Sequence, residues 1–126
     1  MSIKNVKFLV VDDMESMRSI VKATLHSLGV ENVVLGVNGF DGIKKVEQQS
    51  FDMIISDWDM PKVNGLQFLQ YVRDSKEHKH LPFLLLTASK DKQRVIKAIE
   101  AGVSDYLAKP FKPDALEAKL KKILKK

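Results

Sequence analysis

Several apolar stretches of strand length end directly at charged or hydroxyl-bearing residues. Asp12 and Asp13 follow FLVV, Asp57 follows MIIS, Thr87 follows FLLL, and Lys109 follows YLA. Stretches that are apolar throughout, rather than at every second position, are typical of parallel strands covered on both faces. Because the carboxyl ends of parallel strands share one edge of a sheet, we expect these side chains to lie close together.

The segments between the apolar stretches have the spacing of amphipathic helices. We predict strands near residues 7–11, 32–36, 52–56, 82–86 and 105–108. We predict helices near residues 15–28, 40–48, 66–74, 92–101 and 114–124. With right-handed crossovers, this alternation predicts an α/β fold: a doubly wound, five-stranded parallel sheet with five helices.

Length and composition are those of one globular domain. The chain has 126 residues, of which 44% are hydrophobic, and it has no cysteine. Disulfide frameworks, zinc–thiolate sites and thiol catalysis are therefore excluded. The start of the sequence lacks the pattern of a signal peptide, and no apolar run is long enough to span a bilayer. We expect a single domain over residues 1–126, without an output domain or a membrane segment, in the cytoplasm.

The net charge of +5 does not by itself indicate nucleic-acid binding. The lysines are spread along the chain and are densest near its end, where cations complement a helix dipole. No basic run is interleaved with aromatic residues, and no zinc finger or helix-turn-helix pattern is present. A basic face that binds an acidic protein partner is the better interpretation, and we expect no nucleic-acid partner.

The three aspartates at the predicted strand ends call for a cation. Two like unit charges ~4 Å apart repel by about 4 kcal/mol at an effective dielectric near 20. Asp12, Asp13 and Asp57 would therefore destabilise one another unless a positive charge lies among them. Carboxylate oxygens, without nitrogen or sulfur ligands, suit Mg²⁺.

Several motifs together resemble one family. They are the Asp12-Asp13 pair, the run DWDMPKVNG that begins at Asp57, Thr87 with its following alanine, and Tyr106 with the KPF that begins at Lys109. This set resembles response-regulator receiver domains, especially the single-domain receivers of chemotaxis, and the match covers the whole chain. The resemblance implies a flavodoxin-like sheet of strand order 2-1-3-4-5.

The resemblance also implies roles for the residues at the strand ends. Asp57 would be the phosphorylated nucleophile, Lys109 would neutralise the phosphoryl oxygens, and the Thr87 hydroxyl would donate to one of them. Magnesium would be held by Asp12, Asp13, Asp57 and the backbone carbonyl of Asp59. The peptide bond between Lys109 and its following proline would be cis, although from the sequence alone a trans bond is the default.

The partners implied by the resemblance are those of a signalling protein. The phosphoryl group would come from a histidine kinase (CheA-like), and the output would be a flagellar motor switch protein or another acidic amphipathic peptide. A phosphatase could also act on the protein, which we expect to be a monomer. It would catalyse only its own phosphorylation and dephosphorylation. A receiver that serves as a phosphate sink, a relay intermediate or a pilus regulator fits the sequence as well.

The output surface is predicted on the last two helices and the last strand. Tyr106 is the switch aromatic by resemblance, whereas from the residues alone it is a partly buried core aromatic. In the helix near 92–101, apolar residues occupy a wider part of the circumference than is needed to pack against a sheet. The predicted surface consists of Tyr106, Lys90, Lys92, Val95, Ile99, Lys119 and Lys122. In the alternative interpretation Val95 and Ile99 are fully buried and the lysines are ordinary solvated surface.

Two positions depart from the pattern of the chemotaxis receivers. Asp59 stands where an asparagine is expected and adds a fourth acid at the pocket mouth, and Ser89 replaces a larger acidic residue. Both positions tune the lifetime of the acyl phosphate in the family. Asp57 and Asp59 also form an Asp-x-Asp pair, as in haloacid-dehalogenase-like phosphatases. That hypothesis leaves Asp12 and Asp13 unexplained, because its motif belongs to the first strand of a longer chain.

Overall fold

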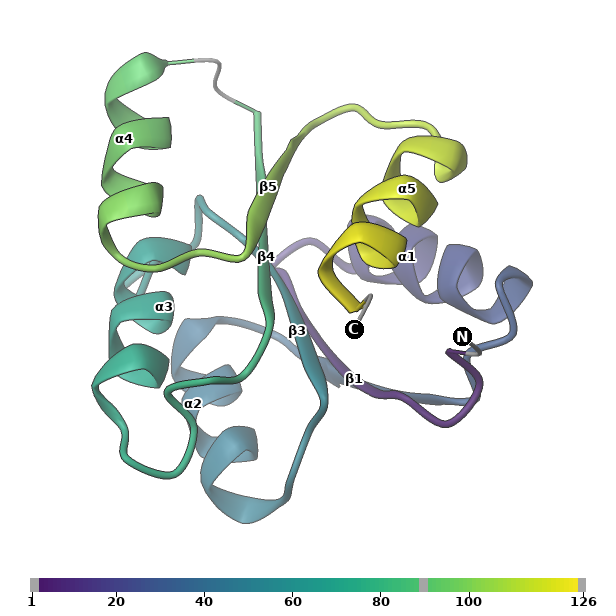
Figure 1. Ribbon diagram of the computed structural model, residues 1–126, viewed down its shortest axis with the longest axis horizontal. Helices are drawn as coiled ribbons and strands as arrows, with labels where there is room; N and C mark the ends of the chain where they lie inside the picture. Colours follow the sequence, from purple (N-terminus) through teal and green to yellow (C-terminus); the bar gives the residue numbers. More distant parts are fainter. Residues whose placement is uncertain (1–2, 89–90, 125–126) are drawn as a thin grey trace.

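The computed structural model describes residues 3–88 and 91–124. Within these residues the sheet is entirely parallel, in the order β2-β1-β3-β4-β5 (Figure 1). Its strands are β1 (Lys7–Val11), β2 (Asn32–Gly36), β3 (Met53–Asp57), β4 (Phe83–Thr87) and β5 (Asp105–Ala108). The helices are α1 (Glu15–Ser27), α2 (Gly39–Gln48), α3 (Gly65–Asp74), α4 (Lys92–Glu100) and α5 (Pro113–Leu124). The predicted fold class and strand order are confirmed.

The boundaries differ from the predicted ones by a residue at several places. β3 and β4 each begin and end one residue later than predicted, so Asp57 and Thr87 are the last residues of their strands. α2 and α3 begin one residue earlier, each directly after an asparagine whose side chain accepts a backbone N–H of the first turn. A capping asparagine satisfies a donor that the helix itself leaves unpaired, and this fixes where the helix begins.

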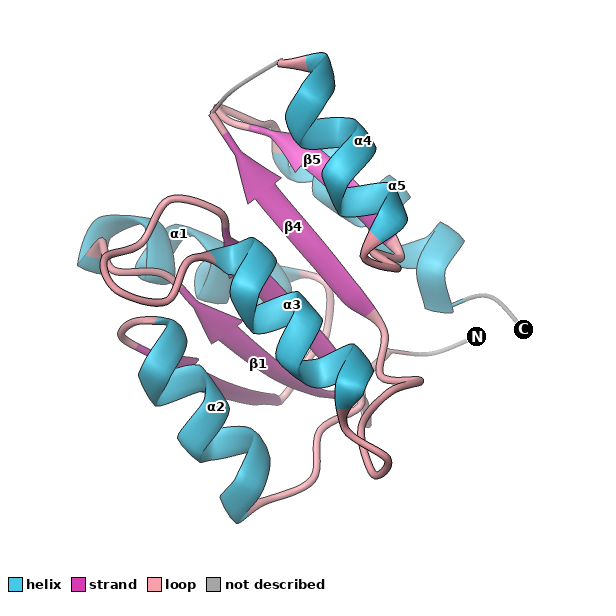
Figure 2. Ribbon diagram, turned by 90° about the vertical axis from the view of Figure 1, so that its left-hand side faces the viewer, coloured by secondary structure: helices cyan, strands magenta, loops and turns pink. Residues whose placement is uncertain are grey.

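Both faces of the sheet are covered, as the continuously apolar strands predict. α1 and α5 pack on one face, while α2, α3 and α4 pack on the other (Figures 1 and 2). Neighbouring residues of one strand enter different cores: Phe8 and Val10 of β1 contact the α1–α5 side, and Leu9 and Val11 the opposite side. Each is at most 1% exposed, so the strands are held by hydrophobic burial on both sides.

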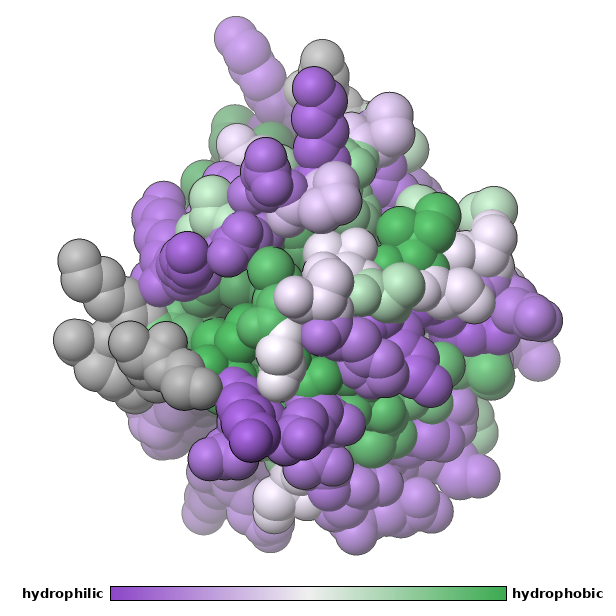
Figure 3. All heavy atoms as spheres, turned by 90° about the vertical axis from the view of Figure 1, so that its right-hand side faces the viewer, coloured by the Kyte–Doolittle hydropathy of each residue, from purple (hydrophilic) through white to green (hydrophobic). Residues whose placement is uncertain are grey.

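The surface on the α1–α5 side is mainly hydrophilic. Figure 3 shows this side, with hydrophobic atoms visible between hydrophilic side chains. No helix among residues 3–88 and 91–124 is both long and apolar enough to cross a membrane.

Arg73, at the end of α3, ties several loops together at the amino ends of the strands. Its Nε donates to the Gly102 carbonyl at 2.8 Å, and its Nη1 donates to the Leu81 carbonyl at 2.6 Å. The first bond reaches the turn after α4, and the second reaches the segment before β4. This half-buried guanidinium therefore joins α3, α4 and β4 at the end of the molecule opposite the strand ends where the predicted site residues lie.

Candidate functional site

The sheet register brings the strand ends together. Val11 pairs with Ser56, so the residues that follow them in sequence, Asp12 and Asp57, lie side by side. Thr87 pairs with Ala108, which places Lys109 just beyond the end of β4. The Lys109 N–H donates to the Thr87 carbonyl at 2.8 Å and continues the ladder past β5.

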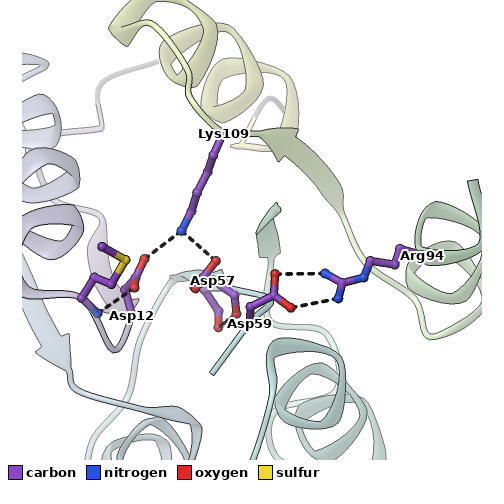
Figure 4. A network of polar contacts seen from close by, with 7 residues as sticks. Asp12, Asp57, Asp59, Arg94 and Lys109 are labelled. Atoms are coloured by element: carbon purple, nitrogen blue, oxygen red, sulfur yellow. Dashed lines mark hydrogen bonds and ion pairs between the residues drawn. The ribbon is translucent and has the colours of Figure 1, made fainter. Parts of the chain in front are cut away.

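Three carboxylates form the floor of the site. One oxygen from each of Asp12, Asp13 and Asp57 lies within 4.8 Å of the others. Asp12 and Asp57 are buried, whereas Asp13 is exposed. The Lys109 ammonium lies 2.8 Å from Asp57 Oδ1 and 3.3 Å from Asp12 Oδ2 (Figure 4). The peptide bond between Lys109 and Pro110 is cis.

Burial and neighbouring charges both shift the pKa values of the groups in this pocket. Burial raises the pKa of Asp57 and the nearby Asp12 raises it further, although Lys109 opposes both effects. Burial alone would lower the pKa of Lys109, but its contacts with Asp57 and Asp12 raise it. Three carboxylates surround one ammonium here, so the charged groups of the pocket sum to an excess of negative charge. The pocket thus favours any added cation.

The donor set fits a hard divalent cation. Among the residues that the structure describes, this is the group of three acidic or imidazole side chains close enough to share an ion. All three donors are carboxylate oxygens, which Mg²⁺ prefers and which soft metals do not. One carboxylate is exposed, so a bound ion would keep contact with water and with an entering ligand.

The run that begins at Asp57 has a packing reason for its glycine. A Cβ at Gly65 would lie 2.3 Å from the Asp57 carbonyl oxygen and 2.8 Å from the Trp58 Cα, which is too close for any other residue. The Gly65 N–H donates to the Trp58 carbonyl at 2.8 Å. The first turn of α3 therefore rests against the backbone of Asp57 and fixes its position.

The predicted switch and output residues occupy β5, α4 and α5. Thr87 is buried, and Tyr106 is half-buried with the Lys119 ammonium 5.5 Å from its ring centroid. Val95 is half-buried, but Ile99 is 62% exposed and Lys92 is also exposed. The alternative in which Val95 and Ile99 are fully buried is therefore wrong. Lys90 and Ser89 lie outside the described residues.

The Asp59 carboxylate, predicted as a fourth acid at the pocket mouth, is paired with Arg94. Its two carboxylate oxygens accept from Arg94 Nη2 and Nη1 at 2.9 and 3.0 Å, and Figure 4 shows its carboxylate facing Arg94. Sequence reasoning missed Arg94. The available signal was the fourth acid itself, because four carboxylates beside one lysine require another countercharge.

Asp105 is a second residue that the sequence prediction missed. Its carboxylate lies 3.1 Å from the Lys119 ammonium and 3.5 Å from that of Lys122. Two lysines predicted to border a partner surface are therefore already paired with an acid on β5. Their positions one turn apart on α5, beside an acid at the start of β5, were the signal that could have shown this pairing.

Comparison with known proteins identifies the family. The response regulator receiver domain matches residues 8–121. Chemotaxis protein CheY-3 of Vibrio cholerae is 39% identical over 98% of this chain and 95% of its own. The structure of CheY4 from Vibrio cholerae superposes with a TM-score of 0.88 and 34% identity, over 94% of this chain and 98% of that one.

A further solved relative contains a metal. The receiver domain of a sensor histidine kinase from Pseudomonas aeruginosa, with magnesium coordinated in its active-site cleft, has a TM-score of 0.84 and 30% identity. The alignment covers 93% of this chain and 95% of that one. Together with the parallel sheet and the acidic pocket at its strand ends, these similarities show that the chain belongs to the response-regulator receiver family and is CheY-like.

Proposed function

We propose that the chain acts in the cytoplasm as a response regulator receiver that a histidine kinase phosphorylates on Asp57 in a Mg²⁺-dependent reaction. The observation that carries this proposal is the contact of Asp57 with Lys109 inside a pocket that has excess negative charge. In the forming acyl phosphate, a carboxylate oxygen of Asp57 bonds to phosphorus while the bond from phosphorus to the donor imidazole breaks. The imidazole nitrogen keeps the electron pair and takes up a proton.

The chain supplies positive charge and a hydrogen-bond donor for the incoming phosphoryl group. Lys109, which already contacts Asp57, would neutralise one phosphoryl oxygen. The Thr87 hydroxyl would donate to another. Mg²⁺ would be held by Asp12, Asp13, Asp57 and the backbone carbonyl of Asp59, and would stabilise the negative charge of the transferring group. The magnesium-containing relative supports this choice of ion.

Phosphorylation with a small donor tests the assignment. Incubation with acetyl phosphate and Mg²⁺ should add one phosphoryl group that is lost at alkaline pH, and Asp57→Asn should abolish it. Asp74→Asn is the matched control, because it makes the same change on an exposed side chain at the end of α3, away from the pocket. Modification of Asp57→Asn would overturn the assignment. Steady hydrolysis of a phosphate ester that Asp59→Asn abolishes would instead support the phosphatase hypothesis.

The output surface is proposed to be the α4–β5–α5 face, which consists of Lys92, Val95, Ile99, Tyr106, Lys119 and Lys122. Ile96 and Ile99 are 47% and 62% exposed, which supplies apolar area for a partner. Lysines next to an apolar strip suit an acidic amphipathic peptide, such as a segment of a flagellar motor switch protein. Pairing with Asp105 leaves Lys119 and Lys122 with about one net positive charge between them, so Lys92 becomes the stronger determinant.

Titration of such a peptide, with and without the phosphate mimic beryllofluoride, tests the surface. The mimic should strengthen binding by about 1–3 kcal/mol, the usual coupling between two sites. Lys92→Glu should weaken binding, whereas Lys121→Glu on the exposed side of α5 should not. Equal affinities with and without the mimic would remove this output. A phosphate sink, a relay or a pilus regulator would then be the better proposal.

A further inference from the structure

The Arg94 guanidinium contacts both residues that follow Asp57, namely Trp58 and Asp59. Its guanidinium forms two parallel hydrogen bonds with the Asp59 carboxylate, at 2.9 and 3.0 Å. The same group lies 5.1 Å from the ring centroid of Trp58, which is 6% exposed. A planar fork that pairs with a carboxylate and stacks on an aromatic ring has little freedom to move. We call this arrangement of Trp58, Asp59 and Arg94 the clasp.

The clasp separates Asp59 from the other acids. The oxygens of Asp12, Asp13 and Asp57 gather within 4.8 Å, and Asp59 is not among them although it is two residues from Asp57. Bidentate pairs with arginine are among the stronger hydrogen bonds in proteins and fix the direction of the carboxylate. Arg94 belongs to the first turn of α4, so the charge of Asp59 is balanced from a different element than the one that carries it.

We propose that Arg94 is a positioning residue that neutralises Asp59 and holds its carboxylate out of the pocket, so that the site presents three acids to a cation instead of four. This inference rests on the proposed function, in which Asp57 accepts a phosphoryl group with the help of Mg²⁺. A fourth free carboxylate would bind the cation more tightly but would repel the anionic phosphoryl donor. Arg94 thus sets the balance between these two ligands of opposite charge.

A double-mutant cycle on Mg²⁺ affinity tests the charge argument. Calorimetric titration of Arg94→Ala should show Mg²⁺ binding about threefold to tenfold tighter, the effect of one unit charge several ångströms away. Asp59→Asn alone leaves an unpaired guanidinium and should weaken binding by a similar factor. Arg94→Ala combined with Asp59→Asn should return close to the wild-type affinity, and Arg94→Lys, which keeps the charge, should lie between Arg94→Ala and wild type.

Lys121→Ala is the matched control for net charge. Lys121 is paired with Glu117 on α5 at 3.2 Å, and its side chain is 73% exposed. Its removal changes the total charge by the same amount as Arg94→Ala but should leave the Mg²⁺ affinity unchanged. Unchanged affinity in Arg94→Ala, or an equal increase in Lys121→Ala, would overturn the proposal.

Trp58 gives a spectroscopic check that Arg94 occupies the clasp in solution. It is the single tryptophan of the chain. Arg94→Ala should change its emission in metal-free buffer, whereas Lys121→Ala should not, and identical spectra for wild type and Arg94→Ala would also overturn the proposal.

Phosphorylation separates this inference from the proposed function. With saturating Mg²⁺, acetyl phosphate should modify Arg94→Ala several-fold more slowly than wild type, and the double variant should recover the rate. If wild type takes up no phosphoryl group, the proposed function fails, while the affinity cycle still decides the role of Arg94. If wild type is phosphorylated and all proteins in the cycle bind Mg²⁺ with the same affinity, the inference about Arg94 fails while the proposed function stands.

Discussion

Asp57 and Asp105 have similar surroundings but opposite electrostatics. Their side chains are 6% and 10% exposed, and each has a lysine ammonium at close range, 2.8 Å for Asp57 and 3.1 Å for Asp105. Burial and the neighbouring Asp12 nevertheless raise the pKa of Asp57. Burial alone would also raise the pKa of Asp105, but the Tyr106 N–H and two lysines lower it overall.

The difference lies in how many positive charges each acid has. In the pocket, Lys109 is shared by Asp57 and Asp12, and Asp13 lies beside them. On β5, a single acid has both Lys119 and Lys122. An undercompensated cluster is a place where a cation stabilises the fold, whereas a compensated one braces α5 against β5 without any ligand. Counting charges around each buried carboxylate therefore distinguishes a candidate binding site from a structural ion pair.

Magnesium should turn the acidic pocket from a destabilising into a stabilising part of the fold, and this is the largest effect we expect. At a concentration of about 100 times its Kd, an ion that binds only the folded state stabilises it by about 2.7 kcal/mol. Asp13→Ala should lose most of that gain, yet in EDTA it should be about 1–2 kcal/mol more stable than wild type because repulsion is relieved. Urea unfolding with EDTA or MgCl₂ measures both. An Asp13→Ala protein that is less stable in EDTA and keeps the full Mg²⁺ effect would show that the cluster is misread.

Asp105→Asn should have the next largest effect, a loss of about 1–2 kcal/mol at neutral pH, because it leaves two lysines without their partner. The folded-state pKa of Asp105 lies below its ordinary 3.8. Its stabilisation is therefore fully present above that ordinary value and is lost as the pH falls through the folded-state value. The gap between wild type and variant should shrink below about pH 4. Asp74→Asn, an exposed change at the end of α3, is the control and should alter stability little at any pH.

Asp57→Asn should act in the opposite direction and raise the metal-free stability by about 1 kcal/mol at pH 7. Because the folded-state pKa of Asp57 is raised, folding penalises its ionised form above that pKa. The penalty disappears as the pH falls below the ordinary 3.8, so the two proteins should converge in acid. Denaturant titrations in EDTA across the pH range check this, and a loss of stability like that of Asp105→Asn would contradict the comparison.

The smallest expected effect separates the two lysines beside Asp105. Lys122 is 75% exposed and 3.5 Å from the acid, so Lys122→Ala should cost at most about 0.5 kcal/mol. Lys119 is 31% exposed and also contacts the Tyr106 ring, so Lys119→Ala should cost about 1 kcal/mol. Salt should weaken the Lys122 contribution more than that of Lys119. Equal losses from the two changes would mean that one lysine does not suffice to balance Asp105.

The sequence predicted the strand ends because hydrophobic burial leaves few choices there. A stretch such as FLVV must be covered on both faces, and the acids that follow it must leave the core, so the place of Asp12 was readable from pattern alone. The strand order and the role of Asp57 came from resemblance, since periodicity does not say which strands are neighbours.

The pairing of side chains between elements was not predictable in the same way. In the sequence, Arg94 is one of several polar residues of an amphipathic helix, and its partner Asp59 is 35 positions away. Whether it turns toward solvent or toward Asp59 depends on the crossing of α4 over the sheet, which no local pattern specifies. The same holds for Lys119, whose partner lies on a strand 14 residues earlier.

The hydrogen bond from Arg73 to the Gly102 carbonyl has a mechanical consequence for α4. It fixes the carboxyl end of α4 near the amino ends of the strands, far from the acidic pocket. The first turn of α4 is instead bonded to Asp59, near that pocket. A helix held at one end and displaced at the other rotates about the held end instead of sliding along its axis. We therefore expect small shifts near Asp57 to move Lys92, at the start of α4, farther than Ile99 near its end. Arg73, which takes no part in the chemistry, holds the end about which the helix would rotate.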